Sequence, residues 1–166
     1  AKAMDMKVIA ADIVPMYNEQ IGDLCDEMYM VQDGGLNTLF EKSDVVVSAV
    51  PHTPASEGMF NAETFSKMKK GSWFINVSRG KLVKTPDLTA ALRSGHLAGA
   101  GLDVTDPEPL PESHELWKMP NVIITSHIAG QSQHSNNRLL EVFVENVRRY
   151  VNGYPLLNLV DKKAGF

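Results

Sequence analysis

The amino-acid sequence predicts an α/β protein with a doubly wound parallel sheet, in which helices alternate with strands. Apolar runs and helical patterns alternate from one end of the chain to the other, as in βα units. The most conspicuous charged residues directly follow apolar runs, and sheets of this kind bind ligands at the carboxyl ends of their strands. With 166 residues and 43% apolar composition, the chain can bury one core. No internal repeat, low-complexity segment or linker divides it.

Six apolar runs predict the strands. The run DVVVSAV is rich in β-branched residues and ends abruptly because Pro51 and Pro54 follow it. The first run, MKVIAAD, has the length and composition of a buried strand. The predicted strands are 6–12, 29–31, 44–50, 72–78, 98–104 and 121–128.

Helix start and stop signals separate these runs. Asn61 is a predicted N-cap, and Gly71 ends the helix that follows it. Thr85 before Pro86 predicts an N-cap with proline at the first helical position, and Gly95 marks the far end of that helix. The predicted helices are 15–27, a short segment at 36–40, 61–68, 85–95, and a long helix at 131–152 with Leu140, Phe143, Val147, Tyr150 and Val151 on one stripe.

Composition excludes several classes of function. Twenty acidic and sixteen basic residues give a net charge of −4, and no basic block exceeds a pair of lysines, so we expect no nucleic-acid partner. No apolar stretch could span a bilayer and the first residues lack the form of a signal peptide, so we expect no membrane partner. Cys25 is the single cysteine, which excludes an intrachain disulfide and argues against a metal site. We therefore expect a cytoplasmic protein without a metal.

Three short strings carry the candidate chemistry. INVSRG and GLDVTDPEP place Arg79 and Glu108 after predicted strands, and TSHIAG places His127 at the carboxyl end of one, so we expect all three at one edge of the sheet. Taken singly, each has a structural alternative: an ion pair for the arginine, a solvated loop acid for the glutamate, and a hydrogen-bonded structural histidine. Their joint placement favours a single pocket.

These residue types suit one kind of reaction. A histidine can give a proton to a carbonyl oxygen or take one from a hydroxyl group near neutral pH. A neighbouring glutamate would orient the ring and favour its protonated form, and an arginine fork suits a carboxylate or a polarised carbonyl. The set predicts a site for a 2-oxo or 2-hydroxy acid, with His127 as the acid or base in a hydride transfer that needs a nicotinamide cofactor.

Asp12 bears on the choice of cofactor. A carboxylate at the end of the second strand of a dinucleotide-binding sheet can hydrogen-bond the adenosine ribose hydroxyls and repel a 2′-phosphate. No arginine occurs in the following residues, IVPMYNEQ, so the sequence favours NAD over NADP. A helix cap is the alternative role for Asp12. For Asp103, too, the alternatives are a ligand-binding role and a helix cap.

The chain resembles the NAD-binding domain of the D-isomer-specific 2-hydroxyacid dehydrogenases. The resemblance covers nearly the whole chain and rests on VSAVPHTPAS, MKKGSWFINVSRGKLV, LRSGHLAGAGLDVTDPEPLP, LWKMPNVIITSHIAG and the tail NLVDKKAGF. The separations of 29 residues from Arg79 to Glu108 and 19 from Glu108 to His127 match the family pattern. The resemblance implies a Rossmann-like fold and reduction of a 2-oxo acid to a D-2-hydroxy acid with NAD.

The resemblance also implies a role for each candidate residue. Arg79 would bind the substrate carboxylate and carbonyl oxygen, His127 would be the acid/base, and Glu108 would pair with His127. Asp103 would hold the nicotinamide carboxamide and Asp12 the adenosine ribose. The remaining lining of the cofactor cleft would be Val50, Pro51, Thr53, Val77, Ser78, Arg79, His127 and Gly130.

The sequence departs from the family pattern at its start. In the family, a strand, a GxGxxG turn and a helix precede the strand that matches MKVIAAD, and this chain has no GxGxxG. In the sheet order 3-2-1-4-5-6, the missing first strand is central, so we expect unpaired strand edges on both sides of it. A separate segment could fill the gap, the sheet could close up, or a second copy could fill it, and we expect a homodimer. Residues 1–166 are expected to be a partial NAD-binding domain, with 154–166 a possible return toward an absent substrate domain.

The sequence has one smaller departure from the family pattern and leaves two alternative functions open. Lys84 stands where many relatives have an acidic residue, which moves the expected helix cap to Thr85. A non-enzymatic, NAD-responsive binding module of the corepressor type would retain the same three charged residues. An inactive fragment that cannot hold NAD is the third possibility, because the pyrophosphate would lack the glycine turn and its helix N-terminus.

Overall fold

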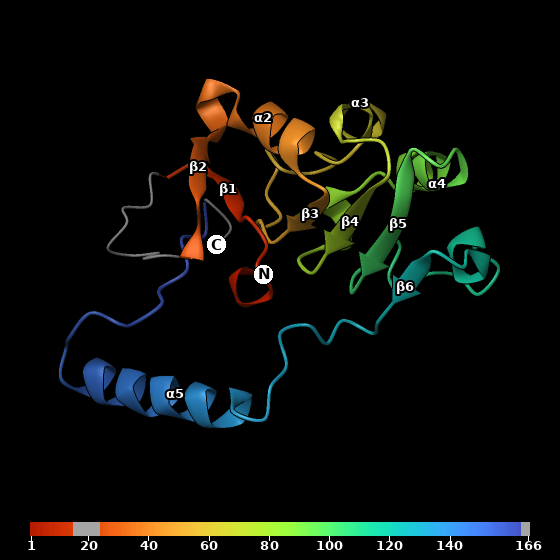
Figure 1. Cartoon of the computed structure of the whole chain (residues 1–166). Helices are drawn as coiled ribbons and strands as arrows, with labels where there is room; N and C mark the ends of the chain where they lie inside the picture. The colour runs from red at the N-terminus through yellow and green to blue at the C-terminus, as the bar shows by residue number, and fades with distance from the viewer. Residues whose placement is uncertain (15–23, 164–166) are drawn as a thin grey trace.

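The computed structural model describes residues 1–14 and 24–163 and confirms the α/β class (Figure 1). All six predicted runs contain strands. The first strand begins three residues later than predicted, and the last four end earlier because the residues at their carboxyl ends turn into loops. The second strand begins two residues earlier than predicted, and Val31 belongs to a 3-10 turn instead. The strands are β1 Ile9–Asp12, β2 Glu27–Met30, β3 Val45–Ser48, β4 Ser72–Asn76, β5 Leu97–Leu102 and β6 Val122–Ile124.

Within the described residues, four α-helices follow the predicted order. They are α2 Gly35–Lys42, α3 Ala62–Lys67, α4 Thr85–Arg93 and α5 Ser135–Val151, with 3-10 turns η1 Lys2–Met4, η3 Val31–Asp33, η4 Gly80–Leu82 and η5 Glu115–Lys118. Most of the predicted helix 15–27 lies outside the described residues. Its last three residues, 25–27, were wrongly assigned, because they lead into β2, where Glu27 pairs with Ile9.

The two predicted N-caps have different outcomes. Asn61 forms a capping box: its side chain accepts hydrogen bonds from two backbone N–H groups of the first turn, and its own N–H donates to Thr64 Oγ1 at 2.7 Å. The prediction for Thr85 was wrong, since Lys84 is the N-cap and Thr85 is the first helical residue. The Thr85 hydroxyl donates instead to the carbonyl of Asp106 at 2.7 Å, a tertiary contact that the local sequence does not reveal.

The strands form two separate parallel sheets. One pairs β1 with β2, and the other has the order β3-β4-β5-β6. In the predicted order the missing central strand would lie between β1 and β3, and these two strands do not pair with each other in the described structure. The sheet therefore stays open instead of closing up (Figure 1).

The core lies on one face of the four-stranded sheet. Phe74 of β4 is fully buried, and its ring centroid lies 4.8 Å from that of Phe60 and 5.3 Å from that of Phe65. The helices α2, α3 and α4 cover this face (Figure 1). Other members of the cluster are Phe40, Val46, Met68, Leu82, Leu88, Leu92, Leu97, Ala100, Leu102, Leu110 and Leu116.

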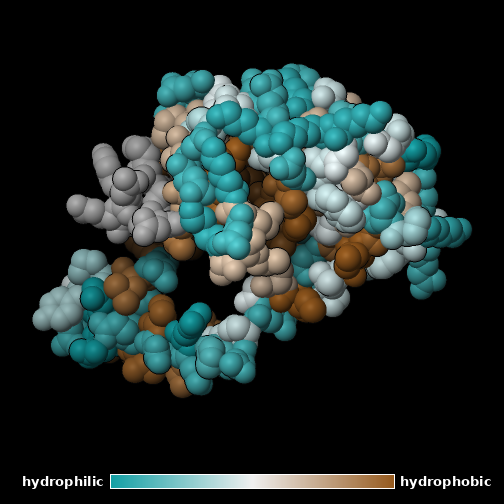
Figure 2. All heavy atoms as spheres, in the orientation of Figure 1, coloured by the Kyte–Doolittle hydropathy of each residue, from teal (hydrophilic) through white to brown (hydrophobic). Residues whose placement is uncertain are grey.

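The opposite face of the same sheet is exposed. Alternate strand residues point to opposite faces, and the side away from the core carries three large apolar residues that are accessible: Val47, Trp73 and Ile123. The helix α5 lies apart from the sheet, and its predicted apolar stripe is also accessible (Figures 1 and 2). In the described part of the chain, no helix is both long and apolar enough to cross a membrane.

Candidate active site at the carboxyl ends of the strands

Loops after β5 and β6 bring Glu108 and His127 together. Glu108 Oε1 lies 2.7 Å from Nδ1 of His127, and the two side chains are 41% and 46% exposed. The contact joins residues 19 positions apart, so the tertiary structure creates it. Because Nδ1 faces the carboxylate, Nε2 is the ring nitrogen available to a ligand.

Asp103 anchors the loop that carries His127. Its buried carboxylate accepts hydrogen bonds from Thr125 Oγ1 at 2.6 Å, from Ile128 N at 2.9 Å and from Ala129 N at 2.8 Å. Its backbone carbonyl accepts the N–H of His127 at 2.9 Å. The Thr125 hydrogen bond is the main reason that the pKa of Asp103 lies below its ordinary value. Burial opposes this shift, and the two amides reinforce it.

Arg79 lies in the loop after β4. Its Nη1 donates to the carbonyl of Ser78 at 2.8 Å, and no carboxylate pairs with it among the residues that the structure describes. The fully buried Asn76 holds this loop, because its side chain donates to Arg79 O at 2.9 Å and accepts from Ser78 N at 3.1 Å. The exposed guanidinium is therefore presented from a fixed backbone and can accept an anionic ligand.

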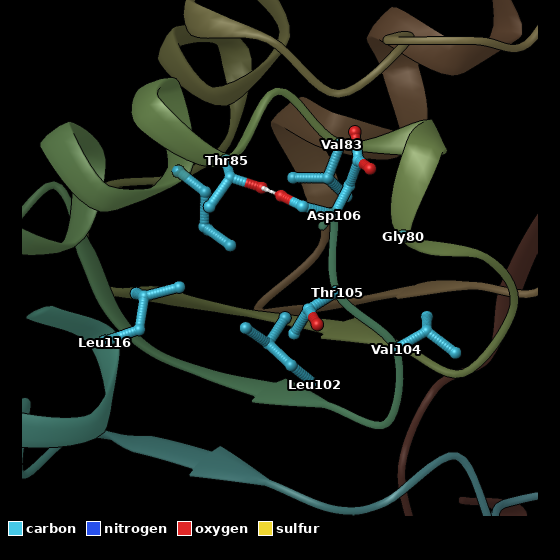
Figure 3. A pocket seen from close by; sticks show the side chains of 9 residues that line it. Gly80, Val83, Thr85, Leu102, Val104, Thr105, Asp106 and Leu116 are labelled. Carbon is cyan, nitrogen blue, oxygen red and sulfur yellow. Dashed lines mark hydrogen bonds between the residues drawn. The ribbon is translucent and has the colours of Figure 1, made fainter. Parts of the chain in front are cut away.

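Close backbone packing joins the Arg79 loop to the loop that carries Glu108. A Cβ on Gly80 would lie 1.8 Å from the carbonyl oxygen of Thr105, so only glycine allows this approach. Figure 3 shows the same junction, with the hydrogen bond from Thr85 to Asp106 beside it. The adjoining cavity measures about 10 Å³, which is room for one water molecule and not for a substrate.

The predicted cofactor residues after β3 and β4 lie on linked loops. The Ser78 hydroxyl donates to the carbonyl of Val50, and Val77 N donates to Ser48 O at 3.2 Å. The backbone N–H of Thr53 donates to the Ser56 hydroxyl at 2.8 Å.

The remaining two cofactor candidates in these loops differ in how they are held. The carbonyl of Pro51 is tied into its own turn, since it accepts the Ser56 hydroxyl at 2.7 Å. Gly130 lies in open space: apart from its chain neighbours, no described residue has an atom within 4 Å of where its Cβ would be.

Asp12 lies apart from the other candidates, at the end of β1 in the two-stranded sheet. Its Oδ1 accepts the backbone N–H groups of Ile13 at 2.6 Å and Val14 at 3.1 Å. Oδ2 has no hydrogen-bond partner within the described chain. One carboxylate oxygen thus supports the local turn and the other can accept a ligand hydroxyl.

The sequence analysis missed two residues that shape the site, Asn76 and Thr125. Each ends an apolar strand with a polar side chain, and each directly precedes a residue or loop already singled out. A buried amide or hydroxyl at a strand end needs a hydrogen-bond partner, so this pattern was a usable signal. Within residues 1–14 and 24–163, no group of three or more His, Cys, Asp or Glu side chains could hold a metal ion.

A parallel α/β sheet carries at its strand ends a histidine–glutamate pair and an arginine that has no carboxylate partner among the described residues, and this arrangement fits a domain of the dehydrogenase class. The comparison with protein families makes this specific. Residues 1–129 match the NAD-binding domain of the D-isomer specific 2-hydroxyacid dehydrogenases, and the chain belongs to this family.

Individual relatives agree with this assignment. The chain is 42% identical over 118 residues to a human glyoxylate reductase/hydroxypyruvate reductase, which covers 71% of the chain and 36% of the relative. It is 36% identical over 162 residues to a glyoxylate reductase of Thermofilum pendens, which covers 98% of the chain and 46% of the relative. The chain thus spans less than half the length of these curated relatives.

Solved structures share the fold. The chain matches an NADPH-dependent glyoxylate/hydroxypyruvate reductase from Sinorhizobium meliloti, in complex with NADP and sulfate, with a TM-score of 0.86 and 32% identity over 99% of the chain and 51% of that structure. It matches a D-isomer specific 2-hydroxyacid dehydrogenase from Xanthobacter autotrophicus Py2, in complex with NADPH and MES, with a TM-score of 0.85 and 31% identity over 100% of the chain and 75% of that structure.

Proposed function

We propose that this chain is the cofactor-domain portion of an NAD-dependent oxidoreductase that interconverts a 2-oxo acid and a D-2-hydroxy acid. The main support is the 2.7 Å contact between His127 and Glu108, at the same sheet edge as Arg79, which has no carboxylate partner within residues 1–14 and 24–163. The bound nicotinamide would supply or accept the hydride. The single cysteine supports a reducing, cytoplasmic location.

Each of the three side chains then has one task. Arg79 binds the substrate carboxylate through its planar fork and draws the carbonyl oxygen toward the same site. Glu108 holds the proton on Nδ1 of His127, which fixes the orientation of the ring. Nε2 of His127 then gives a proton to the substrate oxygen during reduction and takes it back during oxidation.

The residues present fit the two ends of a dinucleotide. Asp12 has a carboxylate oxygen that meets no partner in the described part of the chain and suits the adenosine ribose, and Asp103 lies beside His127, where the nicotinamide carboxamide would bind. Val50, Pro51, Thr53, Val77, Ser78 and Gly130 would line the cleft between them. We propose NAD as the cofactor because Asp12 would repel a 2′-phosphate. Neighbouring structures that hold NADP or NADPH make a direct comparison of NADH and NADPH necessary.

The substrate class follows from the relatives. Among them are proteins named glyoxylate reductase, hydroxypyruvate reductase and glycerate dehydrogenase, all of which act on small 2-oxo or 2-hydroxy acids. Glyoxylate and hydroxypyruvate are therefore the first substrates to test, with NADH oxidation as the readout.

His127→Ala tests the proposed mechanism in the natural protein that carries this chain. We expect kcat to fall by at least ~100-fold, the usual contribution of a general acid, while the Kd for NADH changes by less than about twofold because the ring is not the main source of cofactor affinity. His134→Ala is the control, since His134 is exposed at the start of α5. Equal losses of turnover and NADH affinity would contradict an acid/base role. NADH binding without turnover of any 2-oxo acid would favour the non-enzymatic module.

A further inference from the structure

The backbone of His127 has an unusual conformation. Its φ is 58°, in the left-handed region, which residues with a side chain seldom occupy. Such a conformation persists only where the surrounding structure imposes it. At this position the imposed geometry points the ring at Glu108, so the contacts that hold the loop also determine where the acid/base group lies.

Asp103 and Thr125 supply those contacts. Thr125 is the first residue after β6, and its backbone N–H donates to the carbonyl of Leu102 at 2.9 Å, which aligns it with the end of β5. Its hydroxyl then binds Asp103 Oδ1, while the two amides that follow His127 bind the same carboxylate. Residues before and after His127 in the sequence are thus both hydrogen-bonded to the Asp103 carboxylate.

We infer that Asp103 and Thr125 are positioning residues that hold His127 against Glu108. The inference rests on the proposed function for its catalytic meaning. We call the three hydrogen bonds from Thr125 Oγ1, Ile128 N and Ala129 N to the carboxylate the Asp103 latch. Oδ1 already accepts two hydrogen bonds, so Oδ2 is the oxygen with capacity left for a cofactor amide.

The test uses NMR spectroscopy on the full chain. The difference in His127 ring shifts between the unaltered chain and Glu108→Gln reports the Nδ1–carboxylate contact. The same difference is then measured between Thr125→Val and the double variant Thr125→Val/Glu108→Gln, and we expect it to be smaller by about half or more, as for a coupled pair. We also expect Thr125→Val to speed amide exchange at Ile128 and Ala129 by at least ~10-fold. Thr125→Ser keeps the hydroxyl and should restore both values.

Thr89→Val is the matched control. Thr89 is buried, and its hydroxyl donates to Thr85 O at 2.8 Å inside α4, so this variant also loses a buried hydrogen bond but outside the latch. Unchanged ring shifts and exchange in Thr125→Val, or equal effects in Thr89→Val, would overturn the inference. If Thr125→Val does not fold, Asp103→Asn decides. Asparagine keeps one acceptor oxygen instead of two, so it cannot accept from Ile128 N and Ala129 N on separate oxygens. Exchange should therefore rise at one or both of these amides, and unchanged exchange at both overturns the latch.

Turnover separates the latch from the proposed function. In the natural protein, Thr125→Val should lower kcat for glyoxylate by at least ~10-fold while KM changes less, because proton transfer depends on the position of the ring. If the unaltered protein oxidises no NADH with any 2-oxo acid, the proposed function fails, and the NMR measurements still decide whether the latch exists.

Discussion

Gly80 and His127 are single residues whose backbone positions determine where the site's side chains lie. Gly80 allows the Arg79 loop to touch the backbone of Thr105, and His127 needs a left-handed conformation to meet Glu108. Both requirements come from the tertiary structure. The sequence pattern located Arg79, Glu108 and His127 at the ends of strands but contained no information on these approaches.

Gly80→Ala should destabilise the protein by about 1–3 kcal/mol, the usual cost of forcing an atom into a packed region. The added Cβ would overlap a backbone carbonyl that cannot rotate away. Urea denaturation measures the effect, and Gly130→Ala is the control because its Cβ would meet no neighbour. Similar denaturation midpoints for the two variants would contradict the close approach.

The carboxylate of Asp103 should make stability depend on acid pH. Its pKa is lower in the folded protein than its ordinary value of 3.8, mainly because of the Thr125 hydroxyl. Its stabilising contribution is therefore complete above that value and is lost as pH falls through the lowered pKa. Denaturation at a series of acid pH values should give a flatter profile for Asp103→Asn than for the unaltered chain. Identical slopes would argue against the shift.

At the scale of secondary-structure elements, local signals succeeded where no tertiary contact competed with them. Asn61 caps α3 as predicted, since its side-chain oxygen accepts hydrogen bonds from N–H groups in the first turn of that same helix. Thr85 is not the cap because the helix begins one residue earlier than predicted, and its hydroxyl donates to the carbonyl of Asp106, 21 residues away. Short-range patterns describe the first case completely and cannot describe the second.

Asn61→Ala should reduce the free energy of unfolding by about 1 kcal/mol, the typical value of an N-cap. The variant loses the side-chain acceptor for two backbone N–H groups at 3.0 and 3.2 Å. Asn61→Ser keeps an acceptor and should lose much less. Chemical denaturation of the three proteins provides the measurement, and an alanine variant as stable as the serine variant would refute the capping role.

At the scale of the whole molecule, two features are suited to a partner surface. The edges of β1 and β3 are unpaired with each other, and the face of the larger sheet opposite the core exposes Val47, which is 55% accessible, and Ile123, which is 66% accessible. Accessible apolar faces and open strand edges commonly mark interaction surfaces.

We propose that a second copy covers this face, in line with the homodimer expected from the sequence. Sedimentation equilibrium over a wide range of concentration should detect a dimer, and Ile123→Lys should weaken it because a charge would enter the apolar contact. Leu159→Lys is the matched control, since Leu159 is equally apolar and 79% exposed but lies in the tail. A chain that remains monomeric throughout would exclude this partner.

The sequence by itself determined the α/β class, the order of six strands, the family resemblance and the three charged residues at strand ends. These depend on periodicity, composition and spacing, which are local properties of the chain. Only the tertiary structure decided that the sheet stays open, that Thr85 serves a distant carbonyl, and that Asp103 holds the His127 loop. Those outcomes depend on hydrogen bonds and close approaches between residues far apart in sequence, whose geometry exists only once the chain has folded.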